Sequence, residues 1–348
     1  MRAHVPRFPA LVAVLAAISL LSGCGGAPAA PEPTPAAEAG GAFPVTIPHA
    51  FGGTTVPAKP QRVVALGLND LAVAQTVGAP VVGATRNVAD SGPVLPYLDP
   101  LPPEVLAIDP NAPLSPEQIA AFAPDLILAV SAFQVTDRAT YDRLSTIAPT
   151  VVAAEGLYSA SMQDDARQVG RALGEEQRVD ELIAAADARI AAVGDAADAR
   201  IAAVGDELPG LAGRTYLYGQ ARGEILPMVV GEQNQSTAFM RSLGLAVPES
   251  FASAPASDAL APGTVGISYE EVGRLSEADL LLMTFAGEGD RATFEGDELV
   301  QRVRAVQQGT YVPLTLDQAV ALQAPNVVSA GWLVDQLRPA LEKVAATG

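Results

Sequence analysis

Short apolar runs bounded by glycine or proline recur along the chain, with helix-length segments between them. Runs of about four to six residues in this setting are typical of buried strands, and the intervening segments carry helical periodicity. Strands that alternate with helices favour an α/β fold with a mainly parallel sheet over an all-α or all-β fold. The clearest runs are Arg62–Leu66, Val81–Ala84, Leu126–Val130, Thr215–Tyr218 and Leu280–Phe285.

A pattern of capped helix followed by strand occurs twice. Ser115 is followed three residues later by Gln118, which predicts a capping box at a helix start, and the strand 125–128 comes soon afterwards. Ser268 and Glu271 repeat this box ahead of a second Asp-Leu strand. Each strand precedes a polar loop, a helix and another strand, so the chain is predicted to form two similar α/β lobes. These later pairs are Tyr141–Ile147 with Thr150–Val152, and Leu299–Val306 with Tyr311–Leu314.

Between the predicted lobes lies a tandem duplication with a period of eleven residues. The segment Ala186–Asp195 recurs unchanged as Ala197–Asp206. Eleven residues make about three helical turns, so the second copy lengthens a helix without rotating its face. We expect one helix from about Glu175 to Gly205, with a kink near Gly194; the alternative is a break at Gly194 that forms a protruding hairpin.

The N-terminus has the pattern of an export signal. Basic residues are followed by the apolar run Ala10–Leu21, which is too short to span a bilayer, and then by Leu21-Ser22-Gly23-Cys24. This ending resembles the lipobox of bacterial lipoproteins, which implies a signal peptide over 1–23 and lipidation of Cys24; an ordinary signal peptide is the alternative. Residues 24–42 have a tether-like composition rich in proline, alanine and glycine.

Composition excludes several classes of protein. The 348 residues carry a formal net charge of −18, which argues against binding to nucleic acid or to anionic lipid surfaces. With one cysteine and two histidines, the chain cannot build a Cys/His zinc cluster or an internal disulfide.

Several segments together resemble the ferric-siderophore and cobalamin class of solute-binding lipoproteins. They are Val45–Ile47 through His49, Gly52–Pro57, Lys59–Leu66, the Ser-x-Glu helix start, Pro124–Leu128 and Gln168–Gly174. The resemblance implies a type III periplasmic-binding-protein architecture, in which two lobes with mainly parallel sheets and flanking helices are joined by one rigid helix. It also implies a monomeric receptor that delivers a chelated nutrient to an importer of the ATP-binding-cassette (ABC) type. The expected boundaries are 43–174 and 207–348 for the lobes and 175–206 for the helix, whose duplication departs from the family pattern.

Ligands of open α/β sheets bind beyond the carboxyl ends of the strands, so the loops at those ends supply the candidate ligand residues. Aromatic rings and guanidinium groups there suit a bulky, partly apolar chelate with oxygen edges. For each residue taken singly, a structural role in the core or on the surface is the alternative. The candidates are Leu68, Asn69, Arg86, Asn87, Ser131, Phe133 and Tyr158 in the first lobe, and Gln220, Arg222, Asn234, Phe285 and Trp332 in the second.

Glu117 and Glu270 occupy matching positions in the two repeated helix starts. A carboxylate is favoured there by the helix dipole alone. The resemblance implies a further role, in which an acidic residue on each lobe docks onto basic residues of the permease.

No common catalytic motif is present in the sequence, and His49 is the single histidine left after the signal is removed. We therefore expect no enzyme activity and no cofactor, with iron entering as part of the ligand; a secreted lipoprotein hydrolase and an adhesin-like lipoprotein are the alternatives. Because the chain is acidic, a ferric hydroxamate is favoured over a triply anionic ferric catecholate, and cobalamin and haem stay open. The expected location is outside the cytoplasm, held by lipid on a membrane, in an organism with either one or two membranes.

Overall fold

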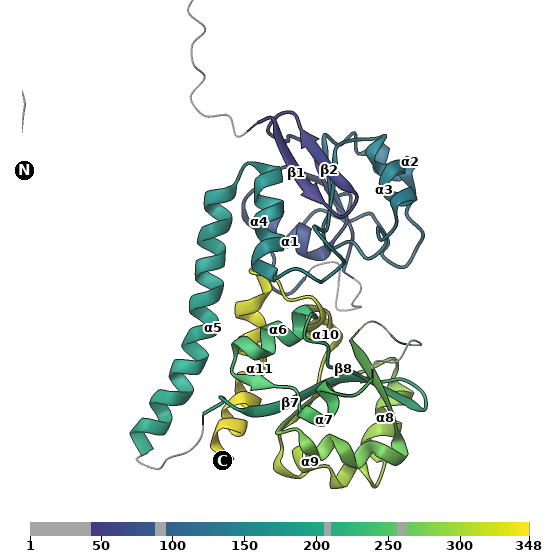
Figure 1. Ribbon diagram of the computed structural model, residues 1–348. Coiled ribbons are helices and arrows are strands. Elements are labelled where there is room, and N and C mark those ends of the chain that lie inside the picture. Colours follow the sequence, from purple (N-terminus) through teal and green to yellow (C-terminus); the bar gives the residue numbers. More distant parts are fainter. Residues whose placement is uncertain (1–42, 88–94, 205–209, 256–259, 261–262, 348) are drawn as a thin grey trace, which may run out of the picture. The chain divides into compact units, whose positions relative to one another are not determined.

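Two separate β-sheets, one in each half of the chain, carry the fold (Figure 1). This computed structural model describes residues 43–87, 95–204, 210–255, 260 and 263–347, with residues 193–204 as helix backbone only. The predicted signal peptide, Cys24 and tether lie outside these residues. Residues 42–348 form one compact unit, within which we call the two sheets and their helices the N-terminal and C-terminal lobes.

The N-terminal lobe contains a fully parallel sheet of four strands in the order β4-β3-β5-β6. An antiparallel hairpin, β1–β2, precedes it. The prediction of a parallel sheet is confirmed for this lobe. Its elements are β1 (Val45–His49), β2 (Gly52–Val56), β3 (Val63–Ala65), α1 (Leu68–Thr76), β4 (Val81–Ala84), α2 (Pro116–Ala121), β5 (Leu126–Ala129), α3 (Arg138–Ser145), β6 (Thr150–Val152) and α4 (Met162–Leu173).

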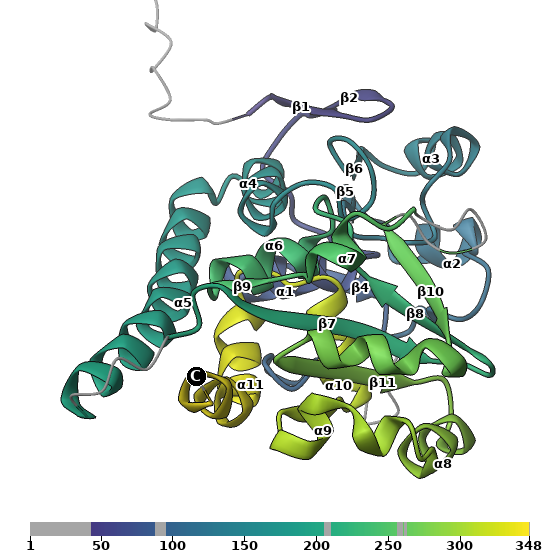
Figure 2. The ribbon, with the colours of Figure 1, turned by 60° about the horizontal axis from the view of Figure 1, so that its bottom comes forward.

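The C-terminal lobe has a mixed sheet in the order β10-β8-β7-β11-β12, with β9 paired to β7 (Figure 2). The pairs of β7 with β9 and β11, and of β11 with β12, are parallel, but β8 and β10 run antiparallel to their neighbours. These two strands were not among those predicted from the sequence. A tight turn at Gly223, which has a φ of 59°, returns the chain directly beside β7, whereas a parallel return needs a long crossover.

The remaining elements follow in chain order. They are α5 (Glu176–Val204), β7 (Arg214–Ala221), β8 (Ile225–Val229), α6 (Gln235–Ser242), β9 (Leu245–Ala246), α7 (Glu249–Ala252), β10 (Thr264–Ser268), the 3₁₀ helix η1 (Tyr269–Glu277), β11 (Leu280–Phe285), α8 (Glu288–Gly296), the 3₁₀ helix η2 (Val300–Arg302), α9 (Arg304–Gln308), β12 (Tyr311–Pro313), α10 (Leu316–Gln323) and α11 (Ser329–Ala346).

Helices cover both faces of each sheet, which explains the uninterrupted apolar runs. Successive side chains of a strand point to opposite faces. In β11, Leu280 and Leu282 join the apolar cluster that includes α6 and α11, whereas Leu281 and Met283 join the cluster beneath α8 and α9. A strand buried on both faces therefore reads as a continuous apolar run, and short runs of this kind were enough to find β4 and β11 with their observed bounds.

The long helix α5 packs against α4 of the N-terminal lobe and α11 of the C-terminal lobe (Figure 1). It is a single helix past Gly194 and as far as Val204, so the hairpin alternative is wrong. Val179, Ile183, Ala186 and Ile190 form its buried stripe, and they belong to one apolar cluster that extends into both lobes. This shared cluster makes α5 a stiff connection between the lobes.

One predicted capping box is only half formed. Ser115 Oγ accepts the N–H of Gln118, as expected at the start of α2. The Gln118 side chain, however, donates to the carbonyl of Ala107 at 3.1 Å instead of returning to Ser115. The carbonyl of a neighbouring loop thus holds the Gln118 side chain away from the Ser115 N–H, and sequence spacing does not reveal such a neighbour.

An aspartate fixes the register of the central parallel pair in each lobe. Asp125, just before β5, accepts the N–H groups of Gln61 and Arg62 at 2.7 and 2.8 Å, and its own N–H donates to the carbonyl of Arg62. Asp279, just before β11, accepts the N–H of Thr215 at 2.8 Å and donates its own N–H to the Thr215 carbonyl. The repeated Asp-Leu sequence therefore encodes the same device twice.

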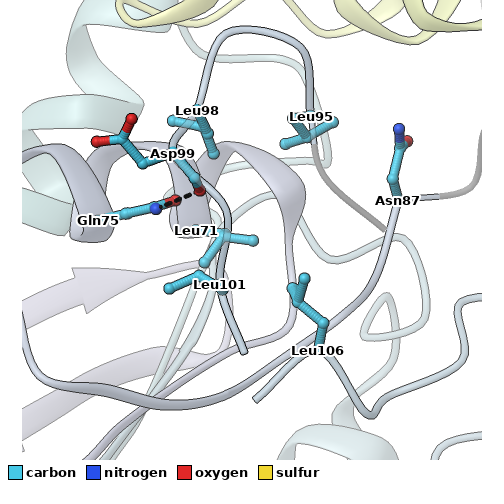
Figure 3. A pocket seen from close by; sticks show the side chains of 8 residues that line it. All are labelled: Leu71, Gln75, Asn87, Leu95, Leu98, Asp99, Leu101 and Leu106. Carbon is cyan, nitrogen blue, oxygen red and sulfur yellow. Dashed lines mark hydrogen bonds between the residues drawn. The ribbon is translucent and has the colours of Figure 1, made fainter. Parts of the chain in front are cut away.

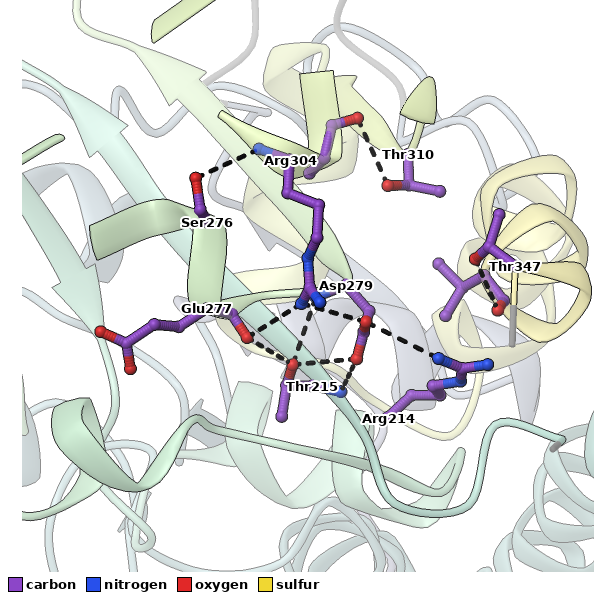
Figure 4. A network of polar contacts seen from close by, with 10 residues as sticks. Arg214, Thr215, Ser276, Glu277, Asp279, Arg304, Thr310 and Thr347 are labelled. Carbon is purple, nitrogen blue, oxygen red and sulfur yellow. Dashed lines mark hydrogen bonds and ion pairs between the residues drawn. The ribbon is translucent and has the colours of Figure 1, made fainter. Parts of the chain in front are cut away.

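In the C-terminal lobe two arginines reinforce this device (Figure 4). Arg304 Nη2 lies 3.1 Å from Asp279 Oδ1, and Arg214 Nη1 lies 3.8 Å from the same oxygen. The Asp279 side chain is only 15% exposed, so its loss would remove the buried negative charge beside two guanidinium groups and the acceptor of the Thr215 N–H.

Replacing Asp279 by alanine is expected to lower the free energy of unfolding by about 2 kcal/mol. Urea denaturation followed by circular dichroism measures the change. The matched control is Asp142→Ala, which breaks an exposed ion pair with Arg138 and is expected to cost under about 0.5 kcal/mol. Equal effects of the two substitutions would contradict the proposed role of Asp279.

Candidate functional site

The carboxyl edges of the two sheets face each other, and side chains from the loops at these edges meet between the lobes. Asn87, after β4, donates from Nδ2 to Oδ1 of Asp317 on α10 at 2.9 Å. Asn326, before α11, donates from Nδ2 to Oδ1 of Asn69 at 3.0 Å. We call this set of contacts the interlobe seam. Two of the predicted ligand residues, Asn69 and Asn87, are thus buried in it.

Trp332 also lies in the interlobe seam. Its indole packs on the ring of Tyr97 with the centroids 5.7 Å apart, and Tyr97 itself is hydrogen-bonded to Asn326. Burial strongly raises the pKa of the Tyr97 phenol, so this ring is neutral at physiological pH. The single tryptophan therefore reports on the packing between the lobes.

Behind the seam is a buried polar cluster built around Asp70 and Ser131. Asp70 accepts the N–H groups of Gly67 and Ser131, and Ser131 Oγ accepts those of Asn69 and Asp70, all at 3.2 to 3.3 Å. Gly67 is required here, because a Cβ on it would lie 2.1 Å from Ser131 Oγ. Burial raises the pKa of Asp70 to about 7.

Tyr158 belongs to this cluster too. Its hydroxyl donates to the carbonyl of Ser131 at 3.4 Å, and its backbone has a φ of 58°, which is strained for a residue other than glycine. Burial, together with the charges of Asp70 and Asp165, raises the pKa of Tyr158 to about 12. The structure places this predicted ligand residue half-buried beside Ser131.

A further contact crosses between the lobes from α6 to α4. Gln235 Nε2 donates to Oδ2 of Asp165 at 2.6 Å and to the carbonyl of Ala160 at 2.9 Å. Burial raises the pKa of Asp165 to about 6. Neither residue was among the predicted site residues, since both lie inside helices and not in loops after strands. Asp70 was not predicted either, although the sequence carries a signal for it. It is an acidic residue in the first turn of α1, directly after the buried strand β3.

An exposed apolar and basic surface accompanies the seam. Phe133 after β5, Ile225 at the start of β8 and Leu316 after β12 are 47%, 50% and 48% exposed. In the part of the chain that the structure describes, Leu299 is the one other large apolar side chain with such exposure. Because β8 is antiparallel to β7, the start of β8 lies at the same edge as the end of β7. Three of these four side chains therefore lie at the facing edges, where burial by a ligand would stabilise a complex.

The two predicted arginines differ in their partners. Arg86 is exposed and forms an ion pair with Asp109. Arg222, in the turn between β7 and β8, is exposed and forms no ion pair with any described residue. Only Arg222 therefore offers an uncompensated positive charge at these edges.

Four other predicted residues have more varied surroundings. Phe285 packs on Phe294 at 6.0 Å and so contributes to the core of the C-terminal lobe. Leu68 begins α1 and is half-exposed, and Gln220 is partly buried near the end of β7. Asn234 follows the antiparallel strand β8, so the parallel-strand argument that selected it does not apply; it is the N-cap residue of α6, next to Gln235.

A hollow of about 220 Å³ lies beside α1 (Figure 3). It is lined mostly by leucines of the N-terminal lobe, and Gln75 Nε2 donates to the Asp99 carbonyl at its wall. That volume includes open solvent, and the enclosed space is about that of one water molecule, so this hollow is too small for a metal chelate. Its lining residues are Leu71, Gln75, Asn87, Leu95, Leu98, Asp99, Leu101 and Leu106.

His49 has a structural environment. Its Nδ1 accepts the N–H of Phe51, so Nε2 carries the proton and donates to Thr54 Oγ1 at 2.9 Å. Burial and the nearby Arg138 lower its pKa. Within the described ranges, no group of three or more His, Cys, Asp or Glu residues could hold a metal ion, and no described helix is long and apolar enough to cross a membrane.

Comparison with known proteins adds a family. The family model described as periplasmic binding protein matches residues 63–312. The ferric enterobactin-binding periplasmic protein FepB of Escherichia coli O6:H1 is 32% identical over 160 residues, which is 43% of this chain and 48% of FepB. The chain thus aligns with about half the length of this curated relative.

Solved structures agree on the fold. A periplasmic solute binding protein from Mycobacterium smegmatis has a TM-score of 0.69 and 26% identity, covering 86% of this chain and 98% of its own. PiaA of Streptococcus pneumoniae, in complex with ferrichrome, has a TM-score of 0.66 and 22% identity, covering 87% of this chain and 99% of its own. The predicted α/β architecture with two lobes is that of these proteins.

Proposed function

The chain belongs to the periplasmic binding protein family, and from this premise we propose that it captures a ferric siderophore and delivers it to an ABC importer. Family membership implies a location outside the cytoplasm and a role in binding rather than catalysis. The proposed binding surface lies between the facing carboxyl edges of the two sheets.

The exposed side chains at these edges carry the proposal. Phe133 contributes an exposed aromatic ring from one lobe, and Ile225 and Leu316 contribute aliphatic surface from the other. A chelate with an apolar body would cover these side chains, while Arg222 would pair with an oxygen at its rim. In this arrangement iron is cargo, held by the oxygens of the siderophore and not by protein side chains.

Charge favours a chelate with little negative charge. Three hydroxamates neutralise ferric iron, whereas three catecholates leave the complex triply anionic. Arg86 is already paired with Asp109, so Arg222 alone would face such a ligand in a chain of net charge −18. We therefore favour a hydroxamate, the class of the ferrichrome bound to PiaA; ferric enterobactin, named for FepB, is the competing ligand. Cobalamin and haem are the further alternatives.

Titration of Trp332 fluorescence with ferrichrome, ferric enterobactin, cobalamin, haem and ferric chloride tests this function. Saturable quenching by ferrichrome, at concentrations where ferric chloride and the other compounds have no effect, is the expected result, because the tryptophan lies between the lobes. Saturation by haem or cobalamin alone would overturn the siderophore proposal.

Phe133→Ala is expected to weaken ferrichrome binding about tenfold or more, since it removes apolar contact area at the ligand surface. Leu299→Ala is the matched control: it removes a similarly exposed apolar side chain away from the facing edges and is expected to change affinity less than twofold. Isothermal titration calorimetry measures both. Equal losses for the two variants would place the ligand elsewhere.

Docking onto the permease is proposed to use Glu117 and Glu270. Both are exposed, and each is the second residue of its helix, in α2 and η1, directly ahead of the central strand of its lobe. Hydrogen bonds from its own backbone N–H and from Ser115 lower the pKa of Glu117, so it is charged at neutral pH. Matching charges on two similar lobes suit a permease with two similar halves. Attachment to the membrane through lipid on Cys24 is part of this proposal.

Reversing both charges with Glu117→Lys and Glu270→Lys is expected to lower siderophore uptake in cells at least tenfold, while ferrichrome affinity of the purified protein is unchanged. The control reverses two other surface charges, Asp142→Lys and Glu298→Lys, one in each lobe. Normal uptake by the first double variant, or an equal loss in the control, would eliminate docking through these residues.

A further inference from the structure

The contact between Asp165 and Gln235 joins two lobes through groups that are both almost inaccessible to solvent. Asp165 is 7% exposed on α4, and Gln235 is 4% exposed on α6. The 2.6 Å hydrogen bond between them, and the bond from Gln235 to the Ala160 carbonyl, cross from one lobe to the other. Separation of the lobes at this point would break both bonds and expose the carboxyl group to water.

While Asp165 is ionised, one polar atom of the Asp165–Gln235 pair lacks a hydrogen-bond donor. The Nε2 group of Gln235 uses its two protons on Asp165 and Ala160, but its Oε1 atom is buried and has no hydrogen-bond partner among the described residues. An unpartnered buried acceptor is costly. A proton on Asp165 supplies the missing donor, because a carboxylic acid and a primary amide can exchange two hydrogen bonds.

The charges around Asp165 also favour the protonated form. Asp70 on α1 is fully buried and close enough to Asp165 for their charges to interact, Tyr158 is near both carboxyl groups, and Asp164 adjoins Asp165 on α4. In the part of the chain that the structure describes, no basic side chain forms an ion pair with Asp165 or Asp70. Two neighbouring buried carboxylates repel each other, which disfavours ionisation of both.

Other charged and polar side chains on the elements packed around α4 form their contacts with residues other than Asp165. These pairs are Arg167 with Asp164 and Asp180, Gln163 with Asp187 of α5, Arg241 of α6 with Glu232, and His49 of β1 with Thr54. Titration of this contact therefore depends on Asp165 and its buried neighbour.

We propose that protonation of Asp165 latches the two lobes together, so that mild acidity favours the closed receptor. This regulation rests on the proposed function only in that the closed lobes would retain the ligand. The sign follows from burial: the pKa of Asp165 is raised to about 6 when the lobes touch and returns toward the ordinary 3.8 when they part. Closure therefore takes up a proton, and the ratio of closed to open receptor rises about tenfold from pH 8 to pH 5.

Energy transfer between two dyes tests this latch without any ligand. In the full chain carrying Cys24→Ala, the labels are attached through Ala139→Cys on α3 and Gln308→Cys on α9, which are exposed positions in different lobes. Transfer is expected to increase from pH 8 to pH 5. Asp165→Asn, which mimics the neutral acid, is expected to give the acidic value at every pH.

Two further variants make the test decisive. Gln235→Met keeps the volume but removes both hydrogen bonds of the amide, and it is expected to lower energy transfer at pH 8 and at pH 5 because the lobes lose this contact, even if Asp165→Asn fails to fold. Asp187→Asn, an exposed carboxylate on α5, is expected to respond as the unmodified protein does. Three outcomes would overturn the latch: no response to pH in the unmodified protein, a response that persists in Asp165→Asn, or energy transfer in Gln235→Met equal to that of the unmodified protein.

The same samples separate this proposal from the siderophore proposal. Ferrichrome is the probe, with its affinity measured at pH 8 and pH 5.5. A pH-dependent energy transfer that Asp165→Asn abolishes supports the latch even where ferrichrome does not bind. Ferrichrome binding with an energy transfer that is constant across pH overturns the latch and leaves the proposed function standing.

Discussion

Parallel pairing of the central strands, β3 with β5 and β7 with β11, is the constraint on which the rest of the structure depends. Parallel strands end at one edge, so every loop that follows them is delivered to the same place. Asp125 and Asp279 fix the register of these pairs by binding backbone N–H groups of the neighbouring strand. Since both sheets obey this rule, two sets of loops are available to face each other.

The apolar cluster along α5 determines how those loops meet. It includes residues of α4, α5, α6 and α11, and it therefore ties the two lobes to one stiff helix. On the other side of the molecule, amide groups, the Asp317 carboxylate and the Tyr97–Trp332 pair complete the interlobe seam at the strand ends.

Much of the fold could be predicted from the sequence, for local reasons. Buried strands such as β11 are marked by apolar runs between polar turns, and the cap at Ser115 and the length of α5 follow from local composition. The antiparallel strands β8 and β10 were not recognised, because Pro227 and Gly266 interrupt their apolar runs. The acceptor of the Gln118 side chain was not recognised either, because it lies on another loop.

The candidate site was less accessible to sequence reasoning. The rule of strand ends located Asn69, Asn87, Ser131 and Phe133 at the facing edges, but it could not distinguish residues that join the lobes from residues left exposed. Asp165 and Gln235 are separated by seventy positions and lie within helices, so only tertiary structure brings them together. Exposure, not residue type, singled out Phe133 and Arg222 as the side chains available to a ligand.

The most direct test of binding between the facing edges uses the paramagnetism of ferric iron. Amide spectra of the protein are compared with ferrichrome and with its diamagnetic gallium analogue, so that line broadening reports distance from the metal. We predict the strongest broadening at the amides of Phe133, Arg222 and Leu316, which come from both lobes. Broadening confined to one lobe, or centred on the leucine-lined hollow at Leu98 and Leu101, would contradict the account.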